Sequence, residues 1–231
     1  MTELAGRRIL VVGASGAFGA QFAEQLSAAS ASVLGTASSD SSMQRLGNSL
    51  VERHVLDLSD QNSIERATSA ILASGEAIDG IILASGEVAF GSAAETPSAI
   101  TERLMKVNFL GQVAVVTALH AALEKSAAEN HAPFVVSISG VIAETPMAGL
   151  SSYSASKTAM HGYATAATRE LRRAGIRWID ARPGHTESGL ATRAIFGQAP
   201  AFGVGLKTED VVARIVSAIK EDEKDLPSSS F

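Results

Sequence analysis

The sequence predicts an α/β fold in which one doubly wound parallel sheet carries helices on both faces. Six short runs of apolar and β-branched residues recur along the 231 residues, segments of helical composition separate them, and the two kinds alternate throughout. Short, almost wholly apolar runs are typical of strands that are buried on both faces. Parallel neighbours require crossover connections, and helices supply them.

The chain is expected to form a single domain over residues 1–231, because no internal repeat or linker interrupts the alternation and the length suits one large domain. The polar C-terminal segment DEKDLPSSSF is expected either to pack against the domain or to be poorly ordered. The expected strands are Ile9–Val12, Ser32–Leu34, His54–Leu56, Gly80–Leu83, Phe134–Ile138 and Arg177–Ala181. The expected helices are Ala17–Ala29, Ser63–Ala73, Ser98–Glu124, Ser152–Ala174 and Glu209–Glu221.

The composition argues against several classes of function. The net charge is −5 and Lys and Arg are scattered, so no nucleic-acid partner is expected. Cysteine is absent and the five histidines show no paired ligand spacing, so neither a thiolate site nor a metal site is expected. The N-terminus matches no signal peptide, and no apolar run is expected to reach the roughly 18 residues of a membrane helix. We therefore expect a cytoplasmic protein without a membrane partner.

A glycine-rich loop, VVGASGAFG, follows the first strand and opens the first helix. Glycines at such a place allow tight turning and close approach of a ligand, and the free N–H groups of the helix start favour a phosphate. The loop predicts a pyrophosphate site, although an ordinary tight turn would also explain it. The residues of this site are Gly13, Ser15, Gly16, Ala17, Phe18 and Gly19.

The third and fourth strands also end in residues suited to a ligand. Asp57, with Leu58 beside it, is placed either to accept a hydrogen bond from an adenine amino group or to cap the helix after Ser59, and both readings stay open. The fourth strand ends in small residues, which leave room for a flat ligand at the carboxyl edge of the sheet or form a plain turn. These small residues are Ala84, Ser85 and Gly86.

The end of the second strand bears on the form of the cofactor. An NAD site usually places a carboxylate there for the ribose hydroxyls, and that carboxylate repels a 2′-phosphate. This chain has Ala37, Ser38 and Ser39 instead, although Asp40 follows and no arginine stands immediately beside them. We therefore expect NADP, with NAD possible.

Tyr153 and Lys157 form a candidate acid–base pair. They are four residues apart in a segment typical of a long helix, so they share one face. A nearby ammonium stabilises a phenolate, and Lys157 is therefore expected to lower the pKa of Tyr153 from its usual value of about 10. The positive potential of the helix N-terminus acts in the same direction.

Together these residues resemble the short-chain dehydrogenase/reductase family over essentially the whole chain. The resemblance rests on Tyr153-x-x-x-Lys157, on Asn108 in MKVNFLG and on the Pro-Gly turn in RPGHTES, which occur in the family's order. It implies a single Rossmann-like domain that forms a homodimer or homotetramer.

The resemblance also implies a role for each site residue. Tyr153 would donate or accept the proton, Lys157 would support it and bind the ribose, and Asn108 would hold a water in a proton relay. The nicotinamide pocket would be lined by Pro183 and Gly184, with Thr186 or Ser188 contacting the carboxamide.

The chain departs from the family's pattern at several positions. Ala17 stands where the commonest glycine motif has a glycine, and the family's N-N-A-G is replaced by Leu83–Gly86. The substrate-positioning serine, thirteen residues before the tyrosine, falls on Gly140. We expect the neighbouring Ser139 to take its role, because it closes the fifth strand and loops absorb insertions. Otherwise the substrate oxygen must be polarised by Asn108, water or His185.

The sequence therefore predicts an oxidoreductase that moves hydride between NADP(H) and a carbonyl or secondary alcohol of a small molecule. A lid over residues 185–206 mixes Leu190, Ile195, Phe196 and Phe202 with Arg193, so a modest apolar substrate is expected. The alternative is a dinucleotide-binding regulator or scaffold without turnover, motivated by the altered motifs. A methyltransferase ranks last, because it gives the tyrosine–lysine pair no purpose.

Overall fold

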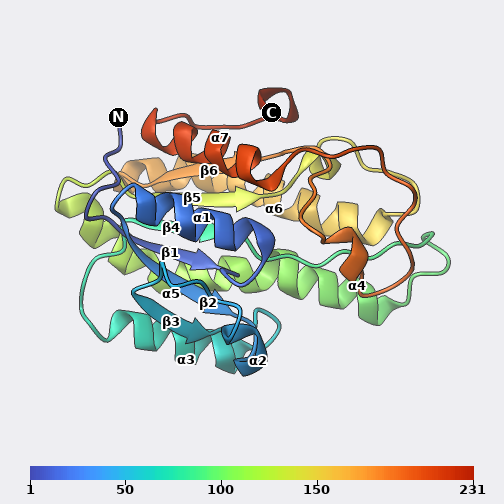
Figure 1. The fold of residues 1–231 in the computed structure, drawn as a ribbon, viewed down its shortest axis with the longest axis horizontal. Helices are drawn as coiled ribbons and strands as arrows, with labels where there is room; N and C mark the ends of the chain where they lie inside the picture. The colour runs from blue at the N-terminus through green and yellow to red at the C-terminus, as the bar shows by residue number, and fades with distance from the viewer.

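The computed structural model describes residues 1–231 and contains one six-stranded, fully parallel sheet in the order β3-β2-β1-β4-β5-β6 (Figure 1). This order confirms the predicted doubly wound α/β class. All six expected strands are present, although β2 and β3 are displaced or extended relative to the expected bounds. The strands are β1 Arg8–Val12, β2 Ser32–Ala37, β3 Glu52–Val55, β4 Gly80–Leu83, β5 Phe134–Ile138 and β6 Arg177–Ala181.

Helices connect all the strands, and the sequence missed one of them, the four-residue helix α2. The α-helices are α1 Ala17–Ala28, α2 Asp40–Met43, α3 Gln61–Leu72, α4 Ser98–Met105, α5 Gly111–Ala128, α6 Ser151–Leu171 and α7 Thr208–Lys220. A π-helical turn, η1 Lys106–Leu110, joins α4 to α5. Single 3-10 turns are η2 Val141–Ala143, η3 Arg172–Ala174, η4 Ala191–Arg193 and η5 Ser228–Ser230.

The two faces of the sheet carry separate cores, and the alternation along β1 shows how the sequence divides them. Ile9 and Val11 pack on one face with α1 and α7, whereas Leu10 and Val12 pack on the other with α3, α5 and α6. The period of two residues in a strand produces this division. Figure 1 shows α1 and α7 lying together over one face.

The strand order reverses between β1 and β4, so the connections leaving these two strands diverge. The two strands pair in register, with Val12 opposite Leu83 at their carboxyl ends. In open parallel sheets, the crevice outside this edge is where ligands bind. The glycine loop after β1 and the small residues after β4 therefore face one another across the crevice.

The segment Ser98–Ala128 corrects one expectation. It contains an 18-residue window of mean hydropathy 1.3, long and apolar enough to cross a membrane by length and composition, whereas we expected no such stretch. Half of that window is buried inside the protein, where Val115, Leu119 and Leu123 join the core beneath α3 and α6. Packing in this core accounts for the apolar composition, because a helix that is buried needs no polar face there.

Candidate active site

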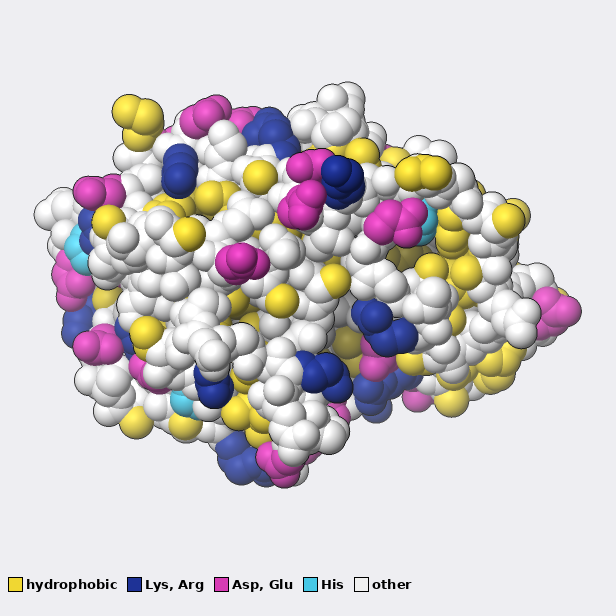
Figure 2. Space-filling model, viewed as in Figure 1, with side chains coloured by type: hydrophobic (Ala, Val, Ile, Leu, Met, Phe, Trp, Pro, Cys, Tyr) yellow, Lys and Arg dark blue, Asp and Glu magenta, His cyan; other side chains and the backbone are white.

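A cleft of about 420 Å³ lies at the carboxyl edge of the sheet and collects most of the expected site residues. Figure 2 shows the hollow on this face, with hydrophobic atoms inside it and Lys or Arg side chains beside it. Four expected residues do not line it: Gly19, Ala37, Ser39 and Asn108. Each of these four has a structural use that holds it away from the cleft, as described below.

The glycine loop presents free amides to the cleft. Gly13 turns with φ +83° and donates its N–H to the Thr36 hydroxyl at 3.0 Å. The amides of Ala17 and Phe18, in the first turn of α1, have no acceptor in the protein, and no acidic residue lies in that turn. Gly19 acts differently from expectation, since a Cβ there would lie 2.2 Å from the Gly13 carbonyl oxygen. It lets α1 pack on the loop and does not contact the cleft.

The end of β2 contributes Ser38 alone. Ala37 is fully buried within the strand, and Ser39 is the N-cap of α2, where its hydroxyl accepts from the Ser42 N–H. Both were expected to contact the cofactor, whereas neither lines the cleft. One residue that sequence reasoning missed also lines the cleft: Arg45, which is exposed and has no carboxylate partner. Arg45 follows helix α2 and is seven residues from Ser38 in the sequence, so it is not the immediately adjacent arginine that such a site was expected to need.

Asp57 resolves one of the open alternatives. The cap of α3 is Asp60, whose side chain accepts from the Asn62 N–H, so Asp57 does not cap this helix. Asp57 Oδ1 accepts from the amide and hydroxyl of Ser59 at 2.8 and 2.7 Å, which leaves Oδ2 without a protein partner. Asp57 and Leu58 both line the cleft, where an unpaired carboxylate oxygen suits an amino donor.

The residues after β4 are held by Asn108. This side chain is fully buried, accepts the Glu87 N–H at 2.8 Å, and donates to the Glu87 carbonyl at 2.9 Å and the Ser156 hydroxyl at 3.0 Å. The π-helical turn of η1 places it there. Ala84, Ser85 and Gly86 line the cleft, and a Cβ on Gly86 would stand 3.5 Å from Lys157 Nζ. Asn108 therefore fixes the floor of the site, and all its side-chain polar atoms are occupied.

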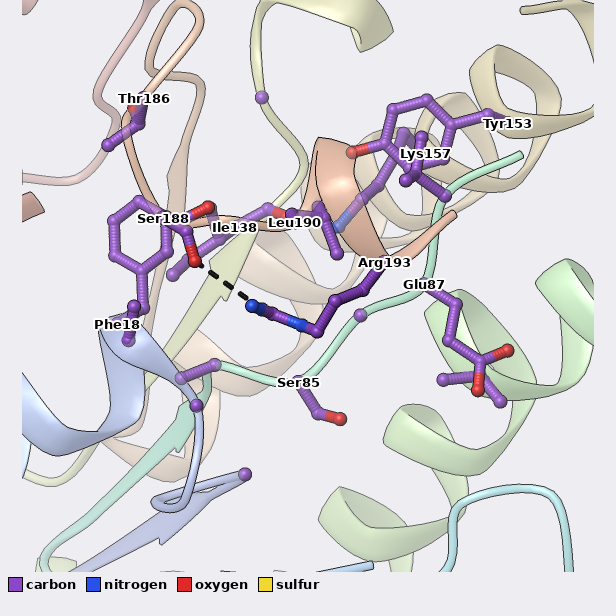
Figure 3. A pocket seen from close by; sticks show the side chains of 18 of the residues that line it. Phe18, Ser85, Glu87, Ile138, Tyr153, Lys157, Thr186, Ser188, Leu190 and Arg193 are labelled. Atoms are coloured by element: carbon purple, nitrogen blue, oxygen red, sulfur yellow. Dashed lines mark hydrogen bonds between the residues drawn. The ribbon is translucent and has the colours of Figure 1, made fainter. Parts of the chain in front are cut away.

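Tyr153 and Lys157 project from the first turns of α6 into the cleft (Figure 3). The tyrosine ring packs against an apolar cluster that includes Val88, Phe90 and Leu150. Lys157 Nζ donates to the Ile138 carbonyl at 2.7 Å and lies 5.9 Å from the centre of the Tyr153 ring. The pair is together, as the spacing predicted, but it makes no direct hydrogen bond.

The pKa directions of the pair differ from expectation. Desolvation by burial raises the pKa of Tyr153 to about 12, whereas we expected Lys157 to lower it. Burial also lowers the pKa of Lys157 to about 8, against the opposing charge of Asp180. The expectation failed because the ammonium is directed to a backbone carbonyl and because the sequence does not show how dry the site is.

Ser139 lines the cleft, as expected, but its hydroxyl is engaged by another residue. It is fully buried, and its hydroxyl donates to Asp180 Oδ2 at 2.6 Å, while Ser137 donates to Asp180 Oδ1 at 2.6 Å. The period of a strand puts both serines on the side where β6 presents its carboxylate. Gly140, in the family's serine position, has φ +76° and lines the cleft. The hydroxyls of Ser137 and Ser139 are therefore both directed at Asp180 in this structure.

Asp180 is the centre of a buried charge cluster that sequence reasoning missed. Besides the two serines, it accepts from His161 Nδ1 at 2.8 Å and from Arg182 at 3.1 Å. Arg182 also bonds Glu144 and Asp225. The residues come from four separate segments, so no spacing in the sequence indicated their meeting.

The Pro-Gly turn and the lid close the far side of the cleft. Pro183, Gly184, Thr186 and Ser188 all line it. The lid is held to the body by backbone hydrogen bonds, from the Phe90 N–H to the Phe196 carbonyl and from the Ile195 N–H to the Val88 carbonyl, each 2.9 Å long.

Within the lid, His185 stacks on Phe202 with ring centres 4.6 Å apart. Arg103 pairs with Glu87 at 2.6 Å and donates to the Ser59 hydroxyl, which closes the wall between β4 and Asp57. Neither contact was expected from the sequence.

Comparison with known proteins assigns the chain to a family. A family model described as short chain dehydrogenase matches residues 7–196. The protein named dehydrogenase/reductase SDR family protein 7-like from Anopheles gambiae is 30% identical over 97% of this chain and 75% of its own length. Its namesake from Drosophila melanogaster is 27% identical over 97% and 73%.

Solved structures share the fold. A 3-ketoacyl-(acyl-carrier-protein) reductase from Brucella melitensis, complexed with NADH, has a TM-score of 0.85 at 20% identity and covers 97% of both chains. A short chain dehydrogenase from Burkholderia cenocepacia, in complex with NADP, has a TM-score of 0.83 at 19% identity over 99% of this chain and 90% of that one. The family model, the curated relatives and the shared fold agree, and the chain belongs to the short-chain dehydrogenase/reductase family of oxidoreductases.

Proposed function

We propose that this protein interconverts a carbonyl and an alcohol on a small substrate, with NADP(H) as its cofactor. The observation that carries the proposal is a single cleft that joins the free amides at the start of α1 to Tyr153 and Lys157 on α6. One end suits a phosphate and the other end suits proton transfer. Both are needed for hydride chemistry with a dinucleotide.

The residues present fit a nicotinamide dinucleotide. Free amides face the middle of the cleft, Gly86 leaves space beside Lys157, and Asp57 Oδ2 is unpaired at the adenine end. When bound, the nicotinamide supplies or takes the hydride. The residues that would hold the dinucleotide are Gly13, Ser15, Gly16, Ala17, Phe18, Ser38, Asp57, Leu58, Ala84, Ser85, Gly86, Lys157, Pro183, Gly184, Thr186 and Ser188.

The protein's own chemistry is proton transfer at the Tyr153 hydroxyl. A hydroxyl with a pKa of about 12 stays protonated at neutral pH and is available to donate a proton to a developing alkoxide. Lys157, with a pKa of about 8, can gain and lose a proton near neutral pH and so can restore the proton of its neighbour. Ser139 fixes the end of β5 through Asp180, and we assign it no contact with the substrate.

The preference for NADP rests on Ser38 and Arg45. Ser38 offers no carboxylate against a 2′-phosphate, and Arg45 supplies an unpaired guanidinium that lines the same cleft. A guanidinium binds phosphate oxygens through a planar fork of donors. The solved relative from Burkholderia cenocepacia that holds NADP, and the one from Brucella melitensis that holds NADH, show that the fold accepts both forms.

The substrate end of the cleft is walled by apolar side chains, which supports a modest apolar substrate. These side chains are Val88, Phe90, Ile142, Leu150, Leu190 and Phe202. The test is the loss of NADPH absorbance with a panel of aldehydes, ketones and quinones. Turnover that Tyr153→Phe abolishes is the expected result. Tight NADPH binding without turnover on any member would instead favour a binding protein, a possibility that the missing hydroxyl at Gly140 raises.

We also propose a homodimer or homotetramer. The support is Leu110, which is 52% exposed between α4 and α5 on a segment of strongly apolar composition. Light scattering of the purified protein measures the mass directly. A monomer at micromolar concentration would contradict the proposal.

A further inference from the structure

Arg193 is a lid residue whose side chain reaches into the middle of the cleft. Figure 3 shows its guanidinium between Ser188 and Ser85, on the path from Phe18 in the glycine loop to Tyr153 and Lys157. Its single hydrogen bond runs from Nη2 to the Ser188 carbonyl and is 3.4 Å long. It forms no salt bridge with any carboxylate. A cation thus lies at the centre of the site with most of its donors unused.

The local backbone favours this position. Arg193 ends the 3-10 turn η4, which the Thr192 hydroxyl closes by donating to the Gly189 carbonyl at 2.9 Å. Gly189 has φ +68°, and a Cβ there would lie 2.8 Å from Arg193 Nη1. A glycine therefore both permits the turn and leaves space for the guanidinium against the backbone.

Nearby acids are already engaged elsewhere. Glu87 lines the cleft but forms a two-pronged ion pair with Arg103, at 2.6 and 2.8 Å. Glu187 accepts the Gly205 N–H at 2.8 Å. The guanidinium therefore shares one cleft with the free N–H donors at the start of α1. The acid in that cleft with an unpaired oxygen, Asp57, lies after β3 and not on the lid. The guanidinium and the N–H donors together attract an anion with several acceptor oxygens.

We propose that Arg193 is a phosphate clamp carried by the lid. It binds the pyrophosphate of the dinucleotide from the side opposite the start of α1, and so couples cofactor binding to closure of residues 185–206. This inference rests on the proposed function. The 2′-phosphate is a separate contact, because Ser38 and Arg45 line the cleft from the segment after β2 and not from the lid.

The affinities of two small nucleotides test the clamp without turnover. ADP-ribose carries the pyrophosphate but no 2′-phosphate, and adenosine 2′-phosphate carries the reverse. In calorimetric titrations, Arg193→Ala is expected to lower the affinity for ADP-ribose about 10- to 100-fold, the range for hydrogen bonds to charged groups. Its affinity for adenosine 2′-phosphate should stay unchanged. Arg193→Lys should recover part of the loss, because lysine keeps the charge but not the fork. Arg45→Ala should lower the affinity for adenosine 2′-phosphate and leave the affinity for ADP-ribose unchanged.

Lys207→Ala is the matched control, because Lys207 is a lid-end cation outside the cleft with a 74% exposed side chain. Its affinities should match the parent protein. Hydrogen exchange measures the coupling: ADP-ribose should slow exchange in residues 185–206 of the parent and not of Arg193→Ala. The thermal midpoints of all variants should agree with the parent, because these side chains are exposed.

Three results would overturn the clamp or its basis, and they are distinguishable. Unchanged ADP-ribose affinity in Arg193→Ala removes the clamp while the proposed cofactor site stands. A rise in KM confined to carboxylate-bearing carbonyl substrates, with ADP-ribose affinity intact, shows that the guanidinium serves the substrate instead. Failure of the parent protein to bind NADPH, ADP-ribose and adenosine 2′-phosphate removes the proposed function itself.

Discussion

Arg182 and Arg193 flank the same Pro-Gly turn, yet their surroundings are opposite. Arg182 has a 5% exposed side chain and bonds Glu144, Asp180 and Asp225, whereas Arg193 is exposed and makes one long bond to a carbonyl. A buried cation without partners would lose its hydration uncompensated, so the first must be paired. A cation in a cleft keeps water until a ligand replaces it. The difference in burial and pairing distinguishes a cation that stabilises the fold from a cation that is available to bind a ligand.

The largest expected effect falls on the cleft side of this comparison. Tyr153→Phe should lower kcat about 10²- to 10⁴-fold, because it removes the proton donor while keeping the ring in its apolar wall. The free energy of unfolding and the NADPH affinity should stay near the parent values. Kinetics with a substrate from the panel and urea denaturation measure the two. Unchanged turnover would remove Tyr153 from the reaction.

On the buried side, Asp180→Ala should cost about 3–5 kcal/mol of unfolding free energy. It removes the one buried carboxylate partner of Arg182 and leaves two serine hydroxyls and His161 without their acceptor. Asp225→Ala is the matched control: it removes a carboxylate from the same Arg182, but one that is 58% exposed, so about 1 kcal/mol or less is expected. Urea denaturation compares them, and Asp180→Asn replaces the alanine variant if that does not fold. Equal losses would show that burial does not distinguish the two partners.

Variants of Ser139 test whether the residue after β5 stabilises the fold or contacts a ligand in the cleft. Ser139→Ala should lower stability by about 1–2 kcal/mol, the usual cost of an unmet buried hydrogen bond, while changing kcat/KM less than about threefold. Ser137→Ala, its neighbour on Asp180, should behave in the same way. A kcat/KM loss of tenfold or more in Ser139→Ala alone would return the serine to the substrate.

Cofactor preference gives a smaller effect. Ser38→Asp places a carboxylate inside the cleft, where it would repel the 2′-phosphate. The affinity for NADPH should therefore fall about tenfold relative to the affinity for NADH. Ala37→Asp is a poor version of this test because Ala37 is fully buried. Fluorescence titration with both cofactors gives the ratio. An unchanged ratio would count against the assignment of this end of the cleft.

The pH dependence of stability gives the most gradual effect. Lys157 has a pKa lowered from 10.5 to about 8, so between these values the unfolded chain holds a proton that the folded protein has lost. Stability from this group therefore rises with pH across that window, by up to about 1.4 kcal/mol per pH unit. Lys157→Met should remove the rise when unfolding curves of the two proteins are compared. Parallel curves would mean that the lysine is not desolvated.

The expected elements and the outline of the cleft could be predicted because they depend on local patterns. The buried strands are short β-branched runs, and the tyrosine and lysine are fixed by helical spacing. Arg45 could not be predicted, because it follows a four-residue helix that the sequence did not indicate and is not adjacent to Ser38 in the chain. The contact between Ser139 and Asp180 could not be predicted, because it forms across a strand pair. The direction of the Tyr153 pKa could not be predicted either, because desolvation depends on packing around the ring.

The end of the chain has a consequence for self-association. Leu226 pairs with β6, accepting the Arg182 N–H at 2.9 Å and donating to the Asp180 carbonyl at 3.2 Å, and the Ser228 hydroxyl bonds Glu144. β6 is an edge strand, and an uncovered edge is a template for pairing with strands of other molecules. The opposite edge, β3, is short and carries Glu52, Arg53 and His54, which discourage such pairing. Loss of residues 224–231 would leave β6 open, so the segment protects the protein against aggregation through that edge.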